Sequence, residues 1–138
     1  MIDRDGVQRW LDAYVEAWRS YDPAAIGALF TADAEYRYHP GDEPTRGREA
    51  IVGEWVKPAG NASSQDAPDT WAARYEAYAV DGNRAVSHGR TTYWTDATHQ
   101  TVEHEYFNVF LMEFDADGRC SSFTEYFMKP RKQARPLG

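Results

Sequence analysis

The sequence contains one cysteine, Cys120, among its 138 residues. It can therefore form no internal disulfide, and a chain of this length buries enough surface to fold without one. No charged and then apolar leader opens the chain, and no apolar run approaches the length of a membrane span. These absences predict a cytoplasmic protein that does not bind a membrane.

Signatures of several kinds of site are also missing. There is no Gly-rich phosphate loop, no nucleophile elbow and no Cys–His pair, which argues against covalent catalysis. No two histidines have the i, i+4 spacing of helical metal ligands, and no cysteine joins them. We therefore expect neither a metal nor a cofactor. The four histidines are His39, His88, His99 and His104.

Negative charge predominates, with a formal net charge of −7. Residues 1–128 carry 11 basic and 22 acidic groups, so this body should repel nucleic acid. The remaining basic groups lie in residues 129–138, a tail that has no acids and contains Pro and Gly. We predict one domain over 1–128 and a flexible basic tail over 129–138, with contact to an anionic partner as the alternative role of the tail.

Hydrophobic spacing predicts three helices in the first half of the chain. An i, i+3, i+4 stripe indicates a long amphipathic helix that ends near Tyr21. Asp22-Pro23 is typical of a new helix start, with Ile26, Leu29 and Phe30 as its apolar side, and residues 47–56 fit a third helix that ends at 58–60. The stripe of the first helix is Val7, Trp10, Leu11, Tyr14, Val15 and Trp18.

Strands dominate the second half. A short strand is predicted over 34–39, after a break at 31–33, and four antiparallel strands over 71–80, 85–94, 102–114 and 119–128. Residues 61–69 read as a loop that could lie over a cavity. Helices early and strands late predict an α+β domain with the helices on one face of a bent sheet. Aromatic residues make up 14% of the chain, which suits a lined cavity, an interface or a core.

The last strand places a carboxylate among aromatic side chains. Glu125 shares a strand face with Phe123 and Phe127. A carboxylate in that setting is costly to ionise without a partner, so Glu125 is either held by a donor or ready for proton transfer. An ordinary outward-facing glutamate is the alternative.

The strand registers set the neighbours of Glu125. A tight turn over 115–118 would place Glu125 opposite Asn108, and the register assumed across the preceding hairpin, which turns around 96–98, would place Asn108 beside Arg90. An arginine near a carboxylate can keep it ionised and orient it, which suits general acid–base catalysis. A solvated Arg90–Glu125 ion pair is the alternative. The face expected from these registers carries His88, Arg90, Thr92, Trp94, His104, Tyr106, Asn108 and Glu125.

Three segments carry a resemblance to a known superfamily: 17–34, 47–51 and 117–127. The chain resembles the nuclear-transport-factor-2-like superfamily, in particular its SnoaL-like, ketosteroid-isomerase-like and limonene-epoxide-hydrolase-like members. This resemblance implies a cone-shaped barrel, in which a curved sheet wraps a pocket that three N-terminal helices close. Isomerases, cyclases, hydrolases and plain binding proteins all use this scaffold.

The limonene-epoxide-hydrolase resemblance implies that Glu125 activates water and that Tyr36 holds it. Tyr38 stands where that family has an asparagine, and Thr92 stands where it has the acid that protonates the epoxide, while Arg90 is kept. Compared with ketosteroid isomerases, Tyr14 lies on the helix that points inward, but no matched pair of acids is present. Met128 stands where SnoaL-type cyclases usually have an aspartate.

These observations predict a pocket for a small apolar or amphipathic molecule. If the protein is an enzyme, we expect a cofactor-free isomerase, cyclase or hydrolase, with Glu125 and Arg90 as catalytic residues. The alternative is a non-catalytic ligand-binding or dimerisation module. Phe107, Val109 and Leu111 on the convex face suggest a homodimer. The expected ligand-binding residues are Tyr14, Trp18, Tyr36, Tyr38, Trp55, Thr92, His104, Tyr106 and Asn108.

Overall fold

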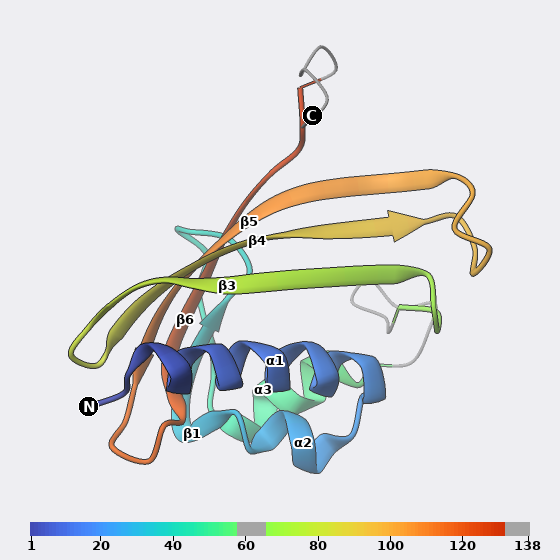
Figure 1. Cartoon of the computed structure of the whole chain (residues 1–138). Coiled ribbons are helices and arrows are strands. Elements are labelled where there is room, and N and C mark those ends of the chain that lie inside the picture. The colour runs from blue at the N-terminus through green and yellow to red at the C-terminus, as the bar shows by residue number, and fades with distance from the viewer. Residues whose placement is uncertain (58–65, 132–138) are drawn as a thin grey trace.

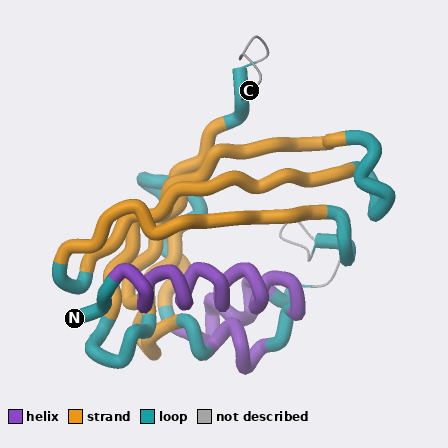
Figure 2. Tube along the Cα trace, viewed as in Figure 1, coloured by secondary structure: helices purple, strands orange, loops and turns teal. Residues whose placement is uncertain are grey.

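A layer of helices packs against one face of a six-stranded sheet (Figures 1 and 2). This computed structural model describes residues 1–57 and 66–131. The helices are α1 (Arg4–Ser20), α2 (Pro23–Gly27) and α3 (Arg48–Trp55). The strands are β1 (Phe30–Arg37), β2 (Thr45–Arg46), β3 (Trp71–Asp81), β4 (Arg84–Trp94), β5 (Val102–Phe114) and β6 (Cys120–Met128).

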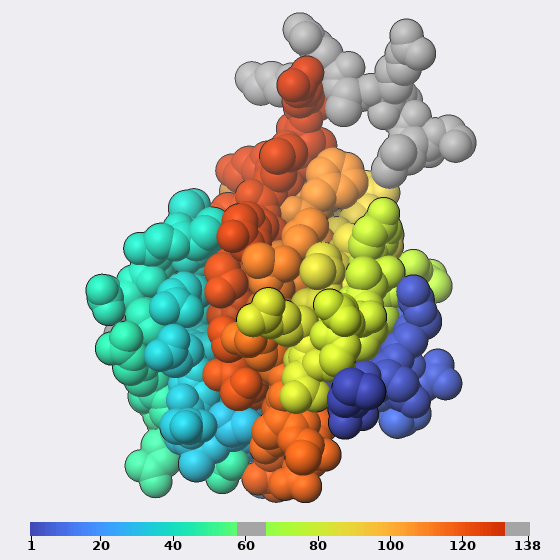
Figure 3. Space-filling view, turned by 90° about the vertical axis from the view of Figure 1, so that its left-hand side faces the viewer, coloured from blue at the N-terminus to red at the C-terminus, as the bar shows by residue number. Residues whose placement is uncertain are grey.

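The sheet has the strand order β2-β1-β6-β5-β4-β3. Consecutive strands from β3 to β6 pair antiparallel as predicted, whereas β1 pairs with β6 in parallel. Figure 3 shows β5 and β6 in the middle of the molecule, between β1 and the β3–β4 hairpin. The sheet does not close into the expected barrel, because β2 and β3 are its two edges and have no pairing with each other. The α+β class is confirmed.

Helix α1 follows its predicted stripe. The Asp3 side chain caps its first turn by accepting a hydrogen bond from the backbone N–H of Gly6 at 2.7 Å. Tyr21 ends it in the left-handed region at φ 50°. Trp10 donates its indole N–H to the carbonyl of Leu29, so the stripe is anchored to the start of β1. The buried members of the helix are Val7, Trp10, Leu11, Tyr14 and Ala17.

The region after α1 differs from the prediction in detail. Asp22 and Pro23 begin α2 as expected, but α2 ends at Gly27, and Phe30 begins β1 rather than continuing a helix. The reason is tertiary, because Phe30 pairs with Cys120 of β6. The expected break at 31–33 lies inside β1, where the register with β6 shifts, and β2 was not predicted. Three predicted features lie wholly or mostly outside the described residues. They are the end of the third helix at 58–60, most of the loop over 61–69, and residues 132–138 of the tail.

The core lies between the helices and the face of the sheet that they cover, here called the inner face; the opposite face is called the outer face. Tyr14 stacks on Phe123 with ring centroids 5.5 Å apart, and Phe123 stacks on Tyr36 at 4.5 Å. Helix and sheet are therefore joined through aromatic rings. Among the described residues, no helix is long and apolar enough to cross a membrane.

Candidate functional site

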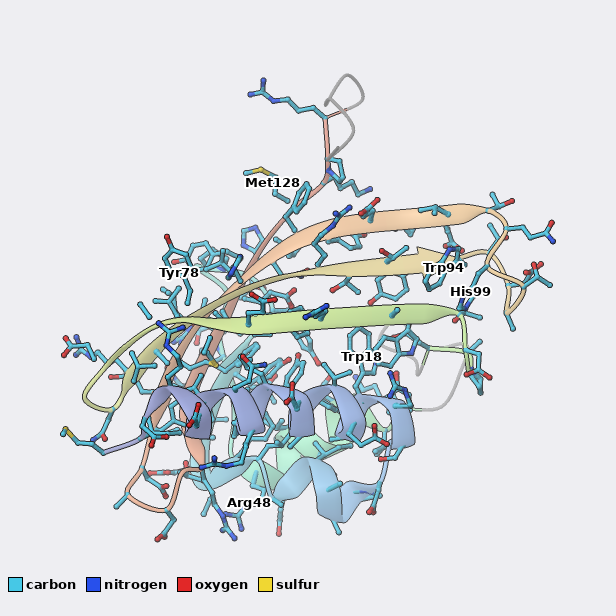
Figure 4. All side chains as sticks on the ribbon, viewed as in Figure 1. Trp18, Arg48, Tyr78, Trp94, His99 and Met128 are labelled. Carbon is cyan, nitrogen blue, oxygen red and sulfur yellow. The ribbon has the colours of Figure 1, made fainter. Side chains whose placement is uncertain are left out.

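A cavity of about 400 Å³ opens beside this aromatic core. Trp18 reaches toward it from α1, in the space between α1 and β3 (Figure 4). Carboxyl groups from three different segments line it, and aromatic side chains make most of the wall. The lining residues are Tyr14, Trp18, Tyr21, Tyr36, Tyr38, Glu54, Trp55, Asp66, Tyr75, Thr91, Tyr93, Tyr106, Asn108, Glu125 and Phe127.

A chain of hydrogen bonds crosses four strands and ends on Glu125. The Tyr75 hydroxyl lies 2.6 Å from the Thr91 hydroxyl, which donates to Asn108 Oδ1 at 2.9 Å. Asn108 Nδ2 then donates to Glu125 Oε2 at 2.7 Å. Because Thr91 uses its hydrogen on Asn108, Tyr75 must be the donor to Thr91. The chain fixes the orientation of the Asn108 amide, so its N–H₂ group is held toward the carboxyl of Glu125.

Glu125 is partly buried, and burial raises its carboxyl pKa to about 7. The hydrogen bond from Asn108 acts in the opposite direction and lowers that pKa. The second oxygen, Oε1, makes no hydrogen bond to any described residue. A carboxyl with a pKa near neutrality and one free oxygen can both accept and return a proton.

We expect the Asn108→Ala variant to raise the pKa of Glu125 further, because the hydrogen bond that favours the carboxylate is lost. The Thr91 hydroxyl would also lose its acceptor inside the fold, which should reduce the free energy of unfolding by about 1–3 kcal/mol. NMR titration of the Glu125 carboxyl and urea denaturation measure the two effects. Asn83→Ala, in the β3–β4 turn, is the control; an unchanged pKa in Asn108→Ala would contradict the prediction.

Two tyrosines form a buried hydroxyl pair near Glu125. Tyr14 on α1 and Tyr36 on β1 have hydroxyl oxygens 2.7 Å apart. Burial raises the pKa of both phenols well above the usual value, and the nearby charge of Glu125 contributes in the same direction. The pair therefore stays protonated. One of the two hydroxyl hydrogens forms the hydrogen bond between the two phenol oxygens, and the other can be donated to a ligand oxygen.

A second carboxyl, that of Asp66, lines the cavity close to the end of α1. Its Oδ2 accepts hydrogen bonds from the Trp18 indole N–H at 2.9 Å and from the Tyr21 hydroxyl at 3.4 Å. Burial raises the Asp66 pKa, and these two donors oppose that rise. Asp66 lay within the predicted loop, and no spacing in the sequence marks it as a cavity residue.

Arg90 and Thr92 do not join Glu125, which corrects the predicted face. Residues of β4 and β5 pair one position away from the expected register, so Gly89, not Arg90, lies opposite Asn108. A slip of one residue moves every side chain to the other face. Arg90 lies on the outer face, where it forms an ion pair with Glu105 and lies over the ring of Phe107. The turn that was predicted around 96–98 is a loop over 95–101, and the register becomes irregular between Tyr93 and Trp94, just before this loop.

The β5–β6 hairpin differs from the prediction by two positions and keeps its faces. Phe110, not Asn108, is opposite Glu125, and Met112 is opposite Phe123. An even shift preserves the alternation, so Asn108 remains on the same face as Glu125 as a diagonal neighbour. Among the other expected cavity residues, Tyr14, Trp18, Tyr36, Tyr38, Trp55 and Tyr106 do line the cavity.

Three further side chains of the predicted face lie elsewhere. His104 shares its row with Tyr106 but is exposed beyond the cavity, and His88 contacts Glu76 on the outer face. Trp94 stacks on His99 with centroids 3.8 Å apart, at the far end of β4 in Figure 4. The prediction missed Thr91, Tyr93 and Tyr75. Thr91 and Tyr93 would have followed from strand alternation with a β4–β5 register shifted by one residue, whereas no register was predicted for Tyr75 on β3.

No group of three potential metal ligands gathers within the described parts of the chain. The cavity instead offers carboxyl, phenol, amide and hydroxyl groups on a rigid frame. Such groups bind a small organic molecule by hydrogen bonds and transfer protons.

Residues 11–123 match the family model described as the SnoaL-like domain. The chain belongs to the SnoaL-like family. Among solved structures, this SnoaL-like chain is similar to an NTF-2-like protein of unknown function from Burkholderia xenovorans LB400, with a TM-score of 0.66, 17% identity and coverage of 97% of each chain. A search of curated proteins finds no match.

Two further solved structures carry names that mention an activity. One is a candidate ketosteroid isomerase from Kribbella flavida DSM 17836, with a TM-score of 0.63, 18% identity, and coverage of 99% of this chain and 86% of that one. The other is an LEH-like epoxide hydrolase from M. tuberculosis, with a TM-score of 0.61, 15% identity, and coverage of 91% and 84%. At these identities the similarity establishes the fold that the SnoaL-like chain shares with them.

Proposed function

We propose that this SnoaL-like protein binds a small, largely apolar molecule in its cavity and acts as a cofactor-free acid–base enzyme through Glu125. One observation carries the proposal. Asn108 holds one oxygen of Glu125 at 2.7 Å, while the other oxygen has no hydrogen bond from the described residues and lies beside a cavity lined with aromatic side chains. A carboxyl held in this way has a defined orientation and a free lone pair for a proton.

The chemistry needs only groups of this chain. Glu125 Oε1 takes a proton from a carbon next to a carbonyl, and the electron pair of that C–H bond moves onto the carbonyl oxygen. A hydroxyl of the Tyr14–Tyr36 pair donates a hydrogen bond to that oxygen. Return of the proton at another carbon completes an isomerisation. If Glu125 instead takes a proton from water, the resulting hydroxide attacks an epoxide carbon and the C–O bond breaks. A hydroxyl of the Tyr14–Tyr36 pair donates a hydrogen bond to the alkoxide formed, which then takes the proton back from Glu125.

The names of similar structures support this range, because an isomerase and an epoxide hydrolase are among them. The alternative is a non-catalytic ligand-binding module. It predicts that the Glu125 carboxyl titrates near its ordinary pKa and that no ligand changes this pKa. The two possibilities therefore differ in a measurable property of one residue.

The deciding experiment is an NMR titration of the Glu125 carboxyl in the free protein and with a panel of small lipophilic ketones, epoxides and lactones. We expect a pKa near 7 that moves when a ligand binds, and loss of turnover in Glu125→Gln for any panel member that the protein converts. A pKa near 4.5 that no ligand moves, or full turnover in the variant, would favour the binding module.

We further propose that two copies pair through the outer face of the sheet. Phe107, Val109 and Leu111 of β5 are 37%, 38% and 42% exposed, and Tyr126 and Met128 of β6 continue this apolar surface. Exposed apolar side chains gathered on neighbouring strands are typical of an interface. A two-fold arrangement would place the same surface of both copies in contact.

Val109→Asp should convert this dimer to a monomer, because it places a charge in the middle of the apolar surface, between Phe107 and Leu111 and opposite Tyr126. Light scattering after size exclusion measures the mass of each variant. Ala13→Glu, on the exposed side of α1, should leave the dimer intact. A wild-type chain that elutes as a monomer would refute the pairing.

A further inference from the structure

The described residues that line the cavity supply acidic groups and no basic ones. Glu54, Asp66 and Glu125 line it, whereas none of the lining residues is a Lys, Arg or His. Residues 58–65, which connect Lys57 to Asp66 in the sequence, contain no charged side chain. Two cations contact lining residues: Lys57 pairs with Glu54 at 3.1 Å, and Lys129 lies over the Tyr106 ring.

Two of the three carboxyls have no cationic partner. Neither Glu125 nor Asp66 forms an ion pair with a described residue, and each is held only by neutral donors. Carboxylates removed from water are normally paired with a cation, because burial alone penalises their charge. The free oxygen of Glu125 is therefore a position where a ligand can supply the missing positive charge.

The rest of the wall suits the same kind of ligand. Rings of Trp18, Tyr38, Tyr93, Tyr106 and Phe127 line the cavity. The faces of aromatic rings attract cations, and cages of such rings recognise quaternary ammonium groups. This protein already uses that attraction at the edge of the cavity, where Lys129 Nζ lies 5.9 Å from the centroid of the Tyr106 ring.

We propose that the ligand of this cavity carries a positive charge on an apolar body, as a tertiary or quaternary ammonium compound does. This inference rests on the proposed function and names its substrate class. It also disfavours anionic substrates, because a carboxylate or phosphate entering the cavity would meet three lining acids, of which only Glu54 is paired with a described base, Lys57. The apolar body packs on the rings while the cation lies toward Glu125 and Asp66.

The proposal implies a pH dependence. The charge of Glu125 raises the pKa of phenols on α1, β1, β3 and β4 and of one phenol just after β1, and burial keeps all of them neutral. They are Tyr14, Tyr36, Tyr75, Tyr93 and Tyr38. Asn108 faces Glu125 from β5, and Glu54 and Asp66 complete the charged lining. A cation stabilises the ionised form of Glu125, so its affinity should rise as pH increases through about 7.

Three molecules of nearly equal shape test the charge: choline, its neutral isostere 3,3-dimethyl-1-butanol, and the anion 3,3-dimethylbutanoate. Each is titrated into the full chain at pH 8 and pH 6, with the Trp18 indole N–H followed by NMR. At pH 8 we expect choline to bind at least about tenfold more tightly than the alcohol, and the anion not to bind. At pH 6 the preference for choline should shrink, while the affinity for the alcohol should stay constant.

Variants locate the effect. Glu125→Gln and Asp66→Asn should each reduce the preference for choline about threefold or more, with folding checked by circular dichroism. Glu113→Gln is the matched control, since it removes one negative charge from β5 on the outer face, where Glu113 pairs with Arg84. Its preference for choline should equal that of the wild type.

Two results would overturn the inference. One is an alcohol that binds as tightly as choline at pH 8, and the other is a Trp18 signal that neither choline nor the bulkier benzyltrimethylammonium shifts. Either result leaves the proposed function standing, because that proposal is tested separately by the pKa of Glu125 and its response to neutral ketones, epoxides and lactones. A pKa near 4.5 would instead refute the acid–base role whatever the charge of the ligand.

Discussion

The Glu125→Gln variant is expected to be more stable than the wild-type chain at pH 8, and nearly equal to it at pH 5. Burial raises the pKa of Glu125 from 4.5 to about 7 in the folded protein. The folded state therefore binds more protons than the unfolded state between these values, so the wild type loses stability as pH rises through this window. The glutamine side chain has nearly the same shape and does not titrate.

The size of the effect follows from the shift. One pKa unit corresponds to about 1.4 kcal/mol, so the difference between variant and wild type should grow by about 2–3 kcal/mol from pH 5 to pH 8. Urea denaturation at both pH values measures it. Glu113→Gln removes an exposed carboxylate and should show no such growth. A constant difference between Glu125→Gln and wild type would mean that Glu125 is solvated in the folded state.

Replacing Gly89 with alanine should cost about 3 kcal/mol or prevent folding. Gly89 lies opposite Tyr75 in the β3–β4 ladder. A Cβ at this position would lie 2.5 Å from Tyr75 Cδ1 and 2.8 Å from Tyr75 Cα, and closer still to the carbonyl oxygen of Arg74. Backbone cannot move that far without breaking the ladder, so the added methyl group overpacks the sheet.

The same glycine gives the Tyr75 ring room to lie over β4, where its hydroxyl meets Thr91. Gly89→Ala should therefore also disturb the hydrogen bonds that end on Glu125. Gly53→Ala is the matched control, because nothing lies within 4 Å of its added Cβ and α3 should gain about 0.5–1 kcal/mol. A denaturation midpoint for Gly89→Ala equal to that of wild type would contradict the close approach of the two strands.

Local sequence patterns predicted most of the helices and strands, and they predicted which side chains share one face of the last strand. The 3.6-residue stripe of α1 predicted its buried side, and the alternation of β6 predicted that Phe123 and Glu125 point the same way. These predictions depend on one segment at a time. The same holds for the Asp22-Pro23 start of α2 and for the extent of α3.

The pairing register of the strands and the positions of loop residues could not be predicted from the sequence. Strand pairing depends on loop length and bulges, and the predicted β4–β5 register was wrong by one residue. The prediction therefore placed Arg90 on the cavity face, where the structure has Thr91 and Tyr93 instead. Asp66 enters the cavity only because Trp18 and Tyr21 at the end of α1 donate to it from 48 and 45 residues away.

The sequence by itself determined which side chains each helix and strand presents together, because that follows from the fixed period of the backbone. Only the tertiary structure decided which strands meet, at what offset, and hence that Glu125 is held by Asn108 rather than Arg90. Those contacts join residues that are distant in the chain. Their geometry is set by the packing of all the elements at once, which no local pattern encodes.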